Sequence, residues 1–283
     1  MKFLALIALL LLSPLLAAQS DSSFFFIQLA DPQFGMYPTG KDFSHERENV
    51  SKAVKAINRL KPEFVVVCGD LVNSEGDLKQ IAAFREEFRK IDKSIPLYLV
   101  AGNHDVGNTP TDSSLLHYRN EFGPDYYTFE RRGVRFIVIN SSLIMDPAKV
   151  PEEARKQEDW LRVQLTNHHS PMNIVFQHHP FFVDNANEPN SYHNLPKETR
   201  TRYLDMFLEN GVTHVFAGHL HHNARGKYES LEMISSGPIG MPLKTDPSGL
   251  RIVKVGPNGV QHEYWPVKKL MRKAEEMEAE RAR

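Results

Sequence analysis

The stretch FFFIQLADPQFG at residues 24–35 decides the fold, because an apolar run ends there in a cluster of polar residues. Its first half, Phe24–Leu29, has the length and composition of a buried β-strand. Its second half places Asp31 and Gln33 directly after that strand. In an open α/β sheet, ligands bind at the carboxyl ends of the strands, so this stretch predicts both a strand and part of a site.

The same arrangement recurs four more times along the chain. Further apolar runs lie at residues 64–67, 97–100, 174–176 and 212–216. The polar motifs that follow them are Gly69-Asp70, Gly102-Asn103-His104-Asp105, His178-His179-Pro180 and Gly218-His219-Leu220-His221. Helical spacing between the runs indicates strand–helix–strand units with mostly parallel pairing, so we expect the motifs to converge on one site. Glycines at three of the strand ends are expected to permit sharp turns there.

The side chains gathered at this site are typical metal ligands. The candidates are Asp31, Gln33, Asp70, Asn103, His178, His219 and His221. A single zinc ion needs only three or four protein ligands, so seven candidates argue for two divalent cations that share a carboxylate.

These motifs resemble those of the calcineurin-like metallophosphoesterase superfamily, in the branch typified by calcineurin-like phosphoesterase domain-containing protein 1. The resemblance is carried by residues 30–35, 68–73, 102–105, 107–110 and 176–178. It implies an α/β fold, a four-layer αββα sandwich of two mixed β-sheets flanked by helices. It also implies that Asp31, Gln33, Asp70 and His221 hold one metal and that Asp70, Asn103, His178 and His219 hold the other. Asp70 is then the bridging ligand.

Two departures from the superfamily pattern bear on the metal. Most members carry His where this chain has Gln33, and an amide oxygen suits manganese or magnesium better than late transition metals. We therefore expect manganese, with iron, zinc and magnesium as alternatives. Asn73 stands where a tyrosine would be needed for the iron–tyrosinate chemistry of purple acid phosphatases.

The chemistry expected of such a site is hydrolysis of a phosphoric ester. Two cations lower the pKa of a water that attacks in line, while the leaving oxygen takes up a proton. His104 is the candidate general acid, and we expect Asp105 to orient its imidazole.

Substrate contacts are less sharply defined by the sequence. Candidates are His179, His222 and Asn223, which follow metal ligands, and Tyr192 in the long polar segment 184–202. For His179, His222 and Asn223, solvent-facing positions are an equally good explanation. Arg200 and Arg202 in the same segment are suited to phosphate or to solvent.

Phosphomonoesters are the expected substrates, as a small phosphorylated molecule or a phosphoprotein. A phosphodiesterase or nucleotide pyrophosphatase is the alternative, because the same two-metal clamp serves both ester classes. A non-catalytic, metal-bearing binding module is the second alternative. The 34 basic and 35 acidic residues nearly balance, so nucleic acid is not an expected partner.

The N-terminus indicates export. Lys2 precedes an apolar stretch at residues 4–16, and small residues follow at positions 17 and 18. We expect residues 1–18 to be a signal peptide, residues 19–266 the metallophosphoesterase domain and residues 267–283 a weakly amphipathic helical tail. The mature protein is then secreted or periplasmic without a stable membrane span, and a retained anchor is the alternative. Cys68 is the only cysteine, so no intrachain disulfide forms, and we expect its thiol to be buried and inert.

Overall fold

The predicted first strand forms as β1 (Phe24–Leu29), and its side chains alternate between two apolar cores. Phe25 and Ile27 pack into one core, while Phe26 packs into the other. β1 is therefore buried on both faces, as expected of a strand inside a layered α/β fold. The computed structural model describes residues 23–39, 42–167 and 172–281. The predicted signal peptide lies outside these residues.

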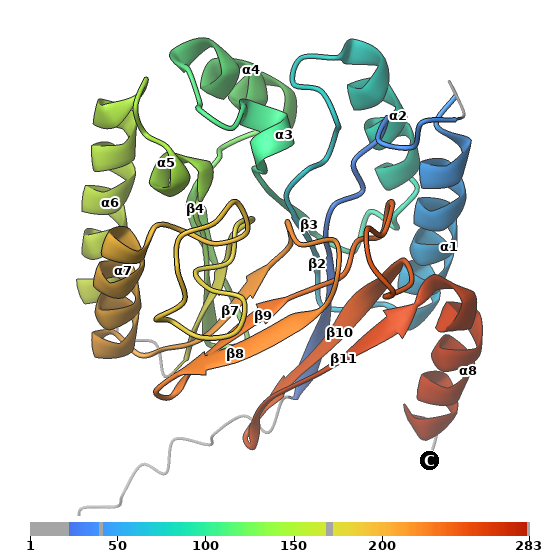
Figure 1. The fold of residues 1–283 in the computed structure, drawn as a ribbon. Helices are drawn as coiled ribbons and strands as arrows, with labels where there is room; N and C mark the ends of the chain where they lie inside the picture. The colour runs from blue at the N-terminus through green and yellow to red at the C-terminus, as the bar shows by residue number, and fades with distance from the viewer. Residues whose placement is uncertain (1–22, 40–41, 168–171, 282–283) are drawn as a thin grey trace, which may run out of the picture.

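Two mixed β-sheets stand face to face (Figure 1). The first has the order β11-β10-β1-β2-β3 and contains β2 (Val65–Cys68), β3 (Leu97–Val100), β10 (Gly249–Gly256) and β11 (Gly259–Pro266). The second has the order β4-β5-β6-β7-β9-β8. Its strands are β4 (Tyr127–Arg131), β5 (Val134–Val138), β6 (Asn173–Phe176), β7 (Val212–Ala217), β8 (Ala224–Tyr228) and β9 (Leu231–Ser235). β1, β2 and β3 are parallel, as are β5, β6, β7 and β9, so each sheet presents several carboxyl ends at one edge.

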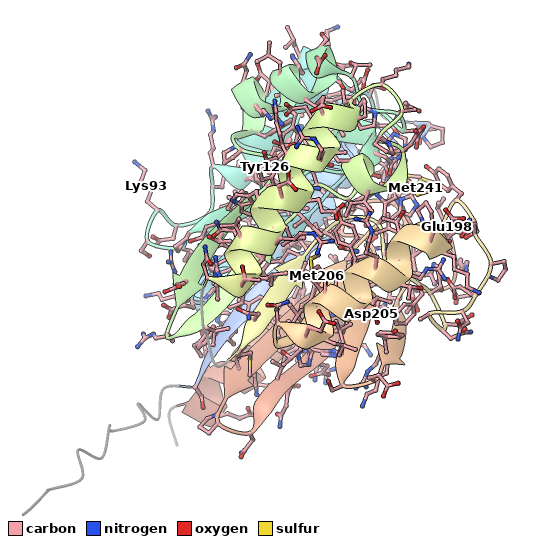
Figure 2. All side chains as sticks on the ribbon, turned by 90° about the vertical axis from the view of Figure 1, so that its left-hand side faces the viewer. Lys93, Tyr126, Glu198, Asp205, Met206 and Met241 are labelled. Atoms are coloured by element: carbon pink, nitrogen blue, oxygen red, sulfur yellow. The ribbon has the colours of Figure 1, made fainter. Side chains whose placement is uncertain are left out.

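Helices cover the outer face of each sheet. On the first sheet lie α1 (Ser44–Leu60), α2 (Leu78–Phe88) and, after the short helix η1 (Val267–Lys269), α8 (Leu270–Arg281) (Figure 1). On the second lie α5 (Ser142–Met145), α6 (Pro151–Thr166) and α7 (Lys197–Glu209), with α6 and α7 side by side (Figure 2). α3 (Asn103–Val106) and α4 (Asp112–Phe122) stand above β3 (Figure 1).

Three apolar clusters separate the four layers. One joins the first sheet to its helices, one joins the second sheet to its helices, and the third fills the space between the sheets. Phe26 of the first sheet and Phe176 of the second meet edge to face in that third cluster, with ring centroids 5.5 Å apart. The structure thus confirms the predicted αββα sandwich.

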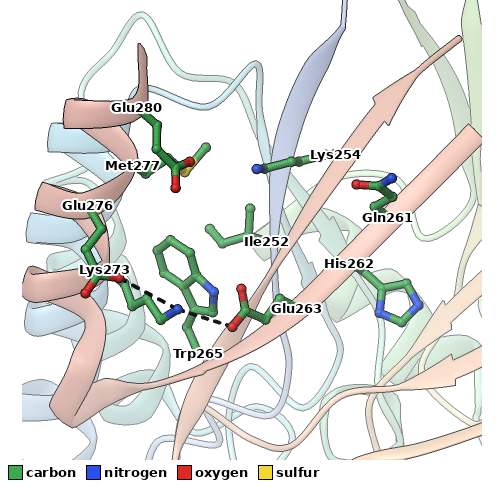
Figure 3. Close-up of a pocket in the computed structure, with 10 residues that line it drawn as sticks. All are labelled: Ile252, Lys254, Gln261, His262, Glu263, Trp265, Lys273, Glu276, Met277 and Glu280. Carbon is green, nitrogen blue, oxygen red and sulfur yellow. Dashed lines mark hydrogen bonds and ion pairs between the residues drawn. The ribbon is translucent and has the colours of Figure 1, made fainter. Parts of the chain in front are cut away.

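The C-terminal helix α8 is part of the body of the protein. Leu270, Ala274 and Met277 are buried against α1 and the first sheet. A cavity of about 240 Å³ lies between α8 and β11, where the ammonium of Lys273 lies over the ring of Trp265 (Figure 3). No candidate metal ligand lines this cavity, so it is separate from the site below.

Candidate metal centre

The polar strand-end motifs meet at one edge of the sandwich, and their ligand atoms form two groups. Asp31, Asp70 and His221 form one group, and His178, His179 and His219 form the other. Within each group the potential ligand atoms lie within 4.8 Å of one another, and all six residues are buried. Two adjacent groups of donors are the arrangement that two metal ions require, with His178 and His219 as the predicted ligands in the second group.

The backbone at the candidate ligands is unusual. Positive φ angles, rare for residues other than glycine, occur at Asp31 (49°), Gln33 (38°), Asp70 (48°), His219 (71°) and His221 (53°). Such conformations cost energy and cluster at functional sites, where the surrounding structure enforces them. The strand ends therefore aim these side chains at the site at the expense of local strain.

Glycines serve the site in two ways. Gly69 has a φ of 78° and makes the predicted turn. Gly102 and Gly218 have no positive φ and allow close approach instead. A Cβ on Gly102 would lie 2.2 Å from Asp70 Oδ1, and one on Gly218 would lie 2.7 Å from Asp31 Oδ2.

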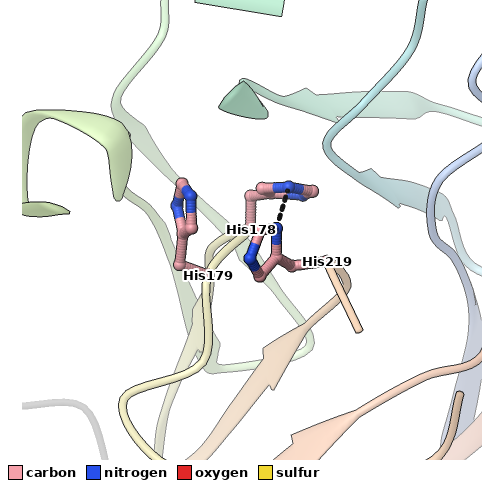
Figure 4. Close-up of side chains that lie close together, drawn as sticks. All are labelled: His178, His179 and His219. Carbon is pink, nitrogen blue, oxygen red and sulfur yellow. Dashed lines mark hydrogen bonds between the residues drawn. The ribbon is translucent and has the colours of Figure 1, made fainter. Parts of the chain in front are cut away.

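Two histidines turn a ring nitrogen toward each other. His178 Nδ1 lies 3.1 Å from the carbonyl oxygen of Cys68, and His219 Nε2 lies 2.8 Å from that of Tyr192. Each of these nitrogens donates to its carbonyl, which turns His178 Nε2 and His219 Nδ1 toward each other at 3.2 Å (Figure 4). His178 Nε2 also lies 3.3 Å from Asp70 Oδ1, and although burial opposes the shift, this carboxylate raises the pKa of His178 to about 9, so a proton on Nε2 holds the place that a metal ion would take. Carbonyl partners of this kind are typical of metal-bound histidine.

Two amide oxygens are also turned toward the site. Asn103 Nδ2 donates to Asn108 Oδ1 (3.1 Å) and to Tyr192 Oη (3.2 Å), so its Oδ1 faces His178 Nε2 at 2.9 Å. The amide nitrogen of Gln33 donates to Asn73 Oδ1 (3.3 Å). Gln33 Oε1 is buried and has no hydrogen-bond partner among the described residues. A bare buried acceptor is costly, and metal ligation would satisfy it.

The two carboxylates differ in their surroundings. Burial raises the pKa of Asp31 to about 6, although the imidazoles of His221 and His178 oppose the rise. Burial alone would also raise the pKa of Asp70, but His178 Nε2, 3.3 Å from its Oδ1, outweighs burial and holds the pKa below its ordinary range. Nearby positive charge stabilises the ionised form of both carboxylates, so the whole donor set fits divalent cations.

His104 and Asp105 do not form the pair that we expected. The imidazole of His104 is oriented by a hydrogen bond from Nδ1 to the carbonyl oxygen of Asn73 (2.7 Å). The carboxylate of Asp105 instead accepts three backbone N–H groups, from Leu71 (2.8 Å), Val72 (3.1 Å) and Gly102 (2.8 Å). Asp105 therefore ties the loop after β2 to the loop after β3, and the orienting role belongs to Asn73.

The predicted substrate contacts lie in different environments. Tyr192 is 52% exposed beside His219, with the ring centroids 4.9 Å apart. His222 donates from Nδ1 to Leu220 O (2.6 Å) and accepts from Lys244 Nζ (3.2 Å). His179 is buried beside the rings of His178 and His219 (Figure 4).

The side chain of Asn223 is held by contacts within the fold. Its amide nitrogen donates to Asp246 (3.1 Å), and its Oδ1 accepts from Gly237 N (3.3 Å) and from Arg251 Nη2 (2.6 Å). These contacts occupy the amide oxygen and one hydrogen of the amide nitrogen, and the substrate contact stays a prediction.

The two arginines of segment 184–202 are likewise engaged elsewhere. Arg200 is fully buried and donates to the carbonyl oxygens of Ala186, Glu188 and Leu195. Arg202 forms an ion pair with Glu158 on the surface between α7 and α6. Arg200 therefore shapes the loop that carries Tyr192 and is not a phosphate contact.

Sequence reasoning missed a further strand-end residue, Ser141, which follows β5. Its Oγ accepts the backbone N–H groups of His178 (3.2 Å) and His179 (2.9 Å) and lies 3.0 Å from His179 Nδ1. Its sequence neighbours, Asn140 and Ser142, are common turn residues, so nothing in the local pattern distinguished it.

A family model described as calcineurin-like phosphoesterase matches residues 26–223. The chain belongs to the calcineurin-like phosphoesterase family. Human serine/threonine-protein phosphatase CPPED1 is 39% identical to it over 269 residues, which cover 88% of this chain and 86% of that protein. The predicted superfamily and branch are thus confirmed.

Two solved structures share the fold of this calcineurin-like phosphoesterase. A dimetal phosphatase from Danio rerio has a TM-score of 0.59 at 18% identity, covering 86% of this chain and 99% of that one. The purple acid phosphatase PPD1 of yellow lupin (Lupinus luteus) has a TM-score of 0.65 at 12% identity, covering 88% and 52%. As a family member, the protein is a metal-dependent hydrolase of phosphoric esters, and the family depends on a dinuclear metal centre.

Proposed function

We propose that this protein is an exported phosphomonoesterase that works with two divalent metal ions, preferably manganese. The observation that carries the proposal is the convergence of ligand atoms: His178 Nε2 and His219 Nδ1 lie 3.2 Å apart, near the buried carboxylates. The orphaned oxygen of Gln33 adds a hard donor, which favours manganese over zinc. Bound divalent ions would supply Lewis-acid stabilisation of the phosphoryl oxygens and an activated water.

In this proposal His104 supplies the proton to the leaving oxygen. The carbonyl of Asn73 accepts from His104 Nδ1 and thereby fixes the imidazole, so that Nε2 is the nitrogen that would carry the proton of the acid. The backbone N–H of His104 donates to Asp70 Oδ1 (2.9 Å), which places the acid beside the proposed bridging carboxylate.

The phosphorylated substrate is a small molecule or a phosphoprotein. The name of the human relative, a serine/threonine-protein phosphatase, supports a phosphomonoester. The exposed Tyr192 offers an aromatic surface and a phenol at the site for the group that carries the phosphate.

Export is proposed from the apolar N-terminal stretch at residues 4–16. Among the described helices, none has both the length and the apolar character that a membrane span requires. Mass spectrometry of the protein recovered from its source cells should show a chain that begins near residue 19. A chain that retains residues 1–18 would contradict cleavage.

The test of function is hydrolysis of p-nitrophenyl phosphate and bis-p-nitrophenyl phosphate by chelator-treated protein titrated with manganese. We expect manganese-dependent cleavage of the monoester, lost in Asp70→Asn. Preference for the diester would contradict the proposal in favour of a phosphodiesterase. Full recovery with zinc alone, without further gain from manganese, would contradict the metal preference.

A further inference from the structure

The hydroxyl of Ser141 fixes which nitrogen of His179 carries the proton. Ser141 Oγ accepts the backbone N–H groups of His178 and His179, which occupy both of its lone pairs. Its one hydrogen must therefore go to His179 Nδ1, 3.0 Å away. An Nδ1–H would instead make a third donor to the same oxygen and leave the serine hydrogen without an acceptor.

His179 is consequently a neutral imidazole with its hydrogen on Nε2. Within the described part of the chain, that N–H has no hydrogen-bond acceptor. The side chain is only 2% exposed, so this hydrogen can be reached only from within the site. A donor that the protein leaves without an acceptor is available to a bound group.

The position of the ring shows what it faces. The ring centroid of His179 lies 4.5 Å from that of His219 and 5.0 Å from that of His178 (Figure 4). A ring nitrogen of each of the three histidines lies within 4.8 Å of the others, and Nδ1 of His179 is already engaged by Ser141. The ring of His179 thus lies against the two candidate ligands, and Nε2 is the ring nitrogen that remains available to a bound group.

A protonated nitrogen cannot ligate a metal, so His179 differs from its two neighbours in kind. His178 and His219 donate to carbonyls and turn their other nitrogens toward each other, whereas His179 accepts from a hydroxyl and offers a hydrogen. We propose that His179 is a catalytic residue whose Nε2–H donates a hydrogen bond to a phosphoryl oxygen of the bound ester or of inorganic phosphate. This assignment rests on the proposed phosphomonoesterase function.

The first measurement is independent of activity and of metal. Long-range ¹H–¹⁵N NMR of the imidazoles in the metal-free protein should show His179 as the Nε2–H tautomer. The resonance is assigned by its loss in His179→Gln. An Nδ1–H tautomer would overturn the proposal, whatever the protein hydrolyses.

The second measurement uses manganese-loaded protein and inorganic phosphate. His179→Phe keeps a flat ring without a donor, and His179→Gln keeps an N–H donor of similar reach. Calorimetry should show phosphate binding weakened about tenfold or more in His179→Phe, as for the loss of a hydrogen bond to a charged group, with part of the loss restored in His179→Gln. Elemental analysis should find equal manganese in all three proteins.

Two outcomes would overturn the role of His179. One is unchanged phosphate binding in His179→Phe, and the other is loss of manganese in both variants, which would make His179 a ligand. Should His179→Phe fail to fold, phosphate binding by His179→Gln is compared with that by the shorter His179→Asn, and equal affinities would overturn the role. Failure of the wild type to bind manganese or phosphate would refute the proposed function itself, a result distinct from these.

Discussion

At the residue scale, His104 and Asp105 are adjacent in sequence but contact different parts of the molecule. The imidazole of His104 hydrogen-bonds to Asn73, while the carboxylate of Asp105 binds three backbone N–H groups. Replacement of His104 should therefore lower kcat, and replacement of Asp105 should lower the free energy of unfolding.

Removal of the proposed acid should matter most for poor leaving groups. In His104→Ala we expect kcat on an alkyl phosphate to fall by about 10²-fold or more. The loss of kcat on p-nitrophenyl phosphate should be smaller, because nitrophenolate leaves without a proton. Equal losses on the two esters would remove the acid role.

Removal of the carboxylate should lower stability. Asp105→Ala leaves three buried N–H groups without an acceptor, and we expect the free energy of unfolding to fall by about 3 kcal/mol or more. The control is Asp159→Ala, whose side chain is 61% exposed and pairs with Arg155, and which should change stability by about 0.5 kcal/mol or less. Urea unfolding measures both. A similar effect of the two variants would contradict the stabilising role of the Asp105 carboxylate.

At the element scale, the loop between β6 and α7 is held by its own buried polar groups. Glu188 accepts the backbone N–H groups of Val183 (2.8 Å) and Asp184 (2.9 Å), and Arg200 binds three carbonyls of the same loop. The loop in turn places Tyr192 O on His219 Nε2 and Tyr192 Oη on Asn103 Nδ2. It is thus a fixed wall of the site that orients two candidate ligands.

Arg200 and Arg202 provide a matched comparison for this loop. Arg200→Ala should destabilise the protein by about 3 kcal/mol and expose the loop to proteolysis, because it leaves buried carbonyls unpaired. Arg202→Ala, which removes a surface ion pair and a half-exposed guanidinium over the ring of Tyr203, should change stability by about 1 kcal/mol or less. Limited proteolysis and thermal melting test this. If Arg200→Ala only raised KM and remained stable, Arg200 would be a phosphate contact after all.

Much of this arrangement was predictable at the level of elements. The five apolar runs were predictable as strands because both faces of such a strand are buried, as Ile27 and Phe26 in different cores show. The ligand motifs were predictable because they follow these strands directly. The edge strand β8, with its sequence ARGKY, lacks such a run and escaped prediction. Ser141 and Arg200 escaped because their roles depend on contacts 37 and 14 residues away, which no local pattern encodes.

At the scale of the whole molecule, the two sheets also meet through a polar network. His262 of β11 hydrogen-bonds to Glu232 of β9 (3.0 Å), which also lies near His214 of β7 (3.9 Å). Burial lowers the pKa of His214 from its ordinary 6.5 to about 4, with Glu232 opposing and His262, Arg225 and Lys227 adding to the shift. His214 is therefore neutral in the folded protein under most conditions.

This network predicts acid destabilisation. Between pH 6.5 and about 4 the unfolded chain binds a proton at His214 that the folded protein excludes, so stability should fall as the pH drops through this range. Thermal melting from pH 7 to pH 5 should show a smaller decrease in His214→Gln than in the wild type. An equal or steeper decrease in the variant would contradict a buried neutral His214.

The proposed metal centre is itself a product of the sandwich. Asp31, Asp70 and Asn103 follow strands of the first sheet, whereas His178, His219 and His221 follow strands of the second. The ligand sets are complete only when the sheets are packed, so metal binding and folding should be coupled.

The most direct test of this account is the manganese stoichiometry of the chelator-treated protein, measured by isothermal titration calorimetry for the wild type and for Asp70→Asn. We predict two ions per chain in the wild type and at most one tightly bound ion in the variant, which lacks the bridging carboxylate. A wild type that binds fewer than two ions, or a variant that binds two as tightly, would contradict a dinuclear centre bridged by Asp70.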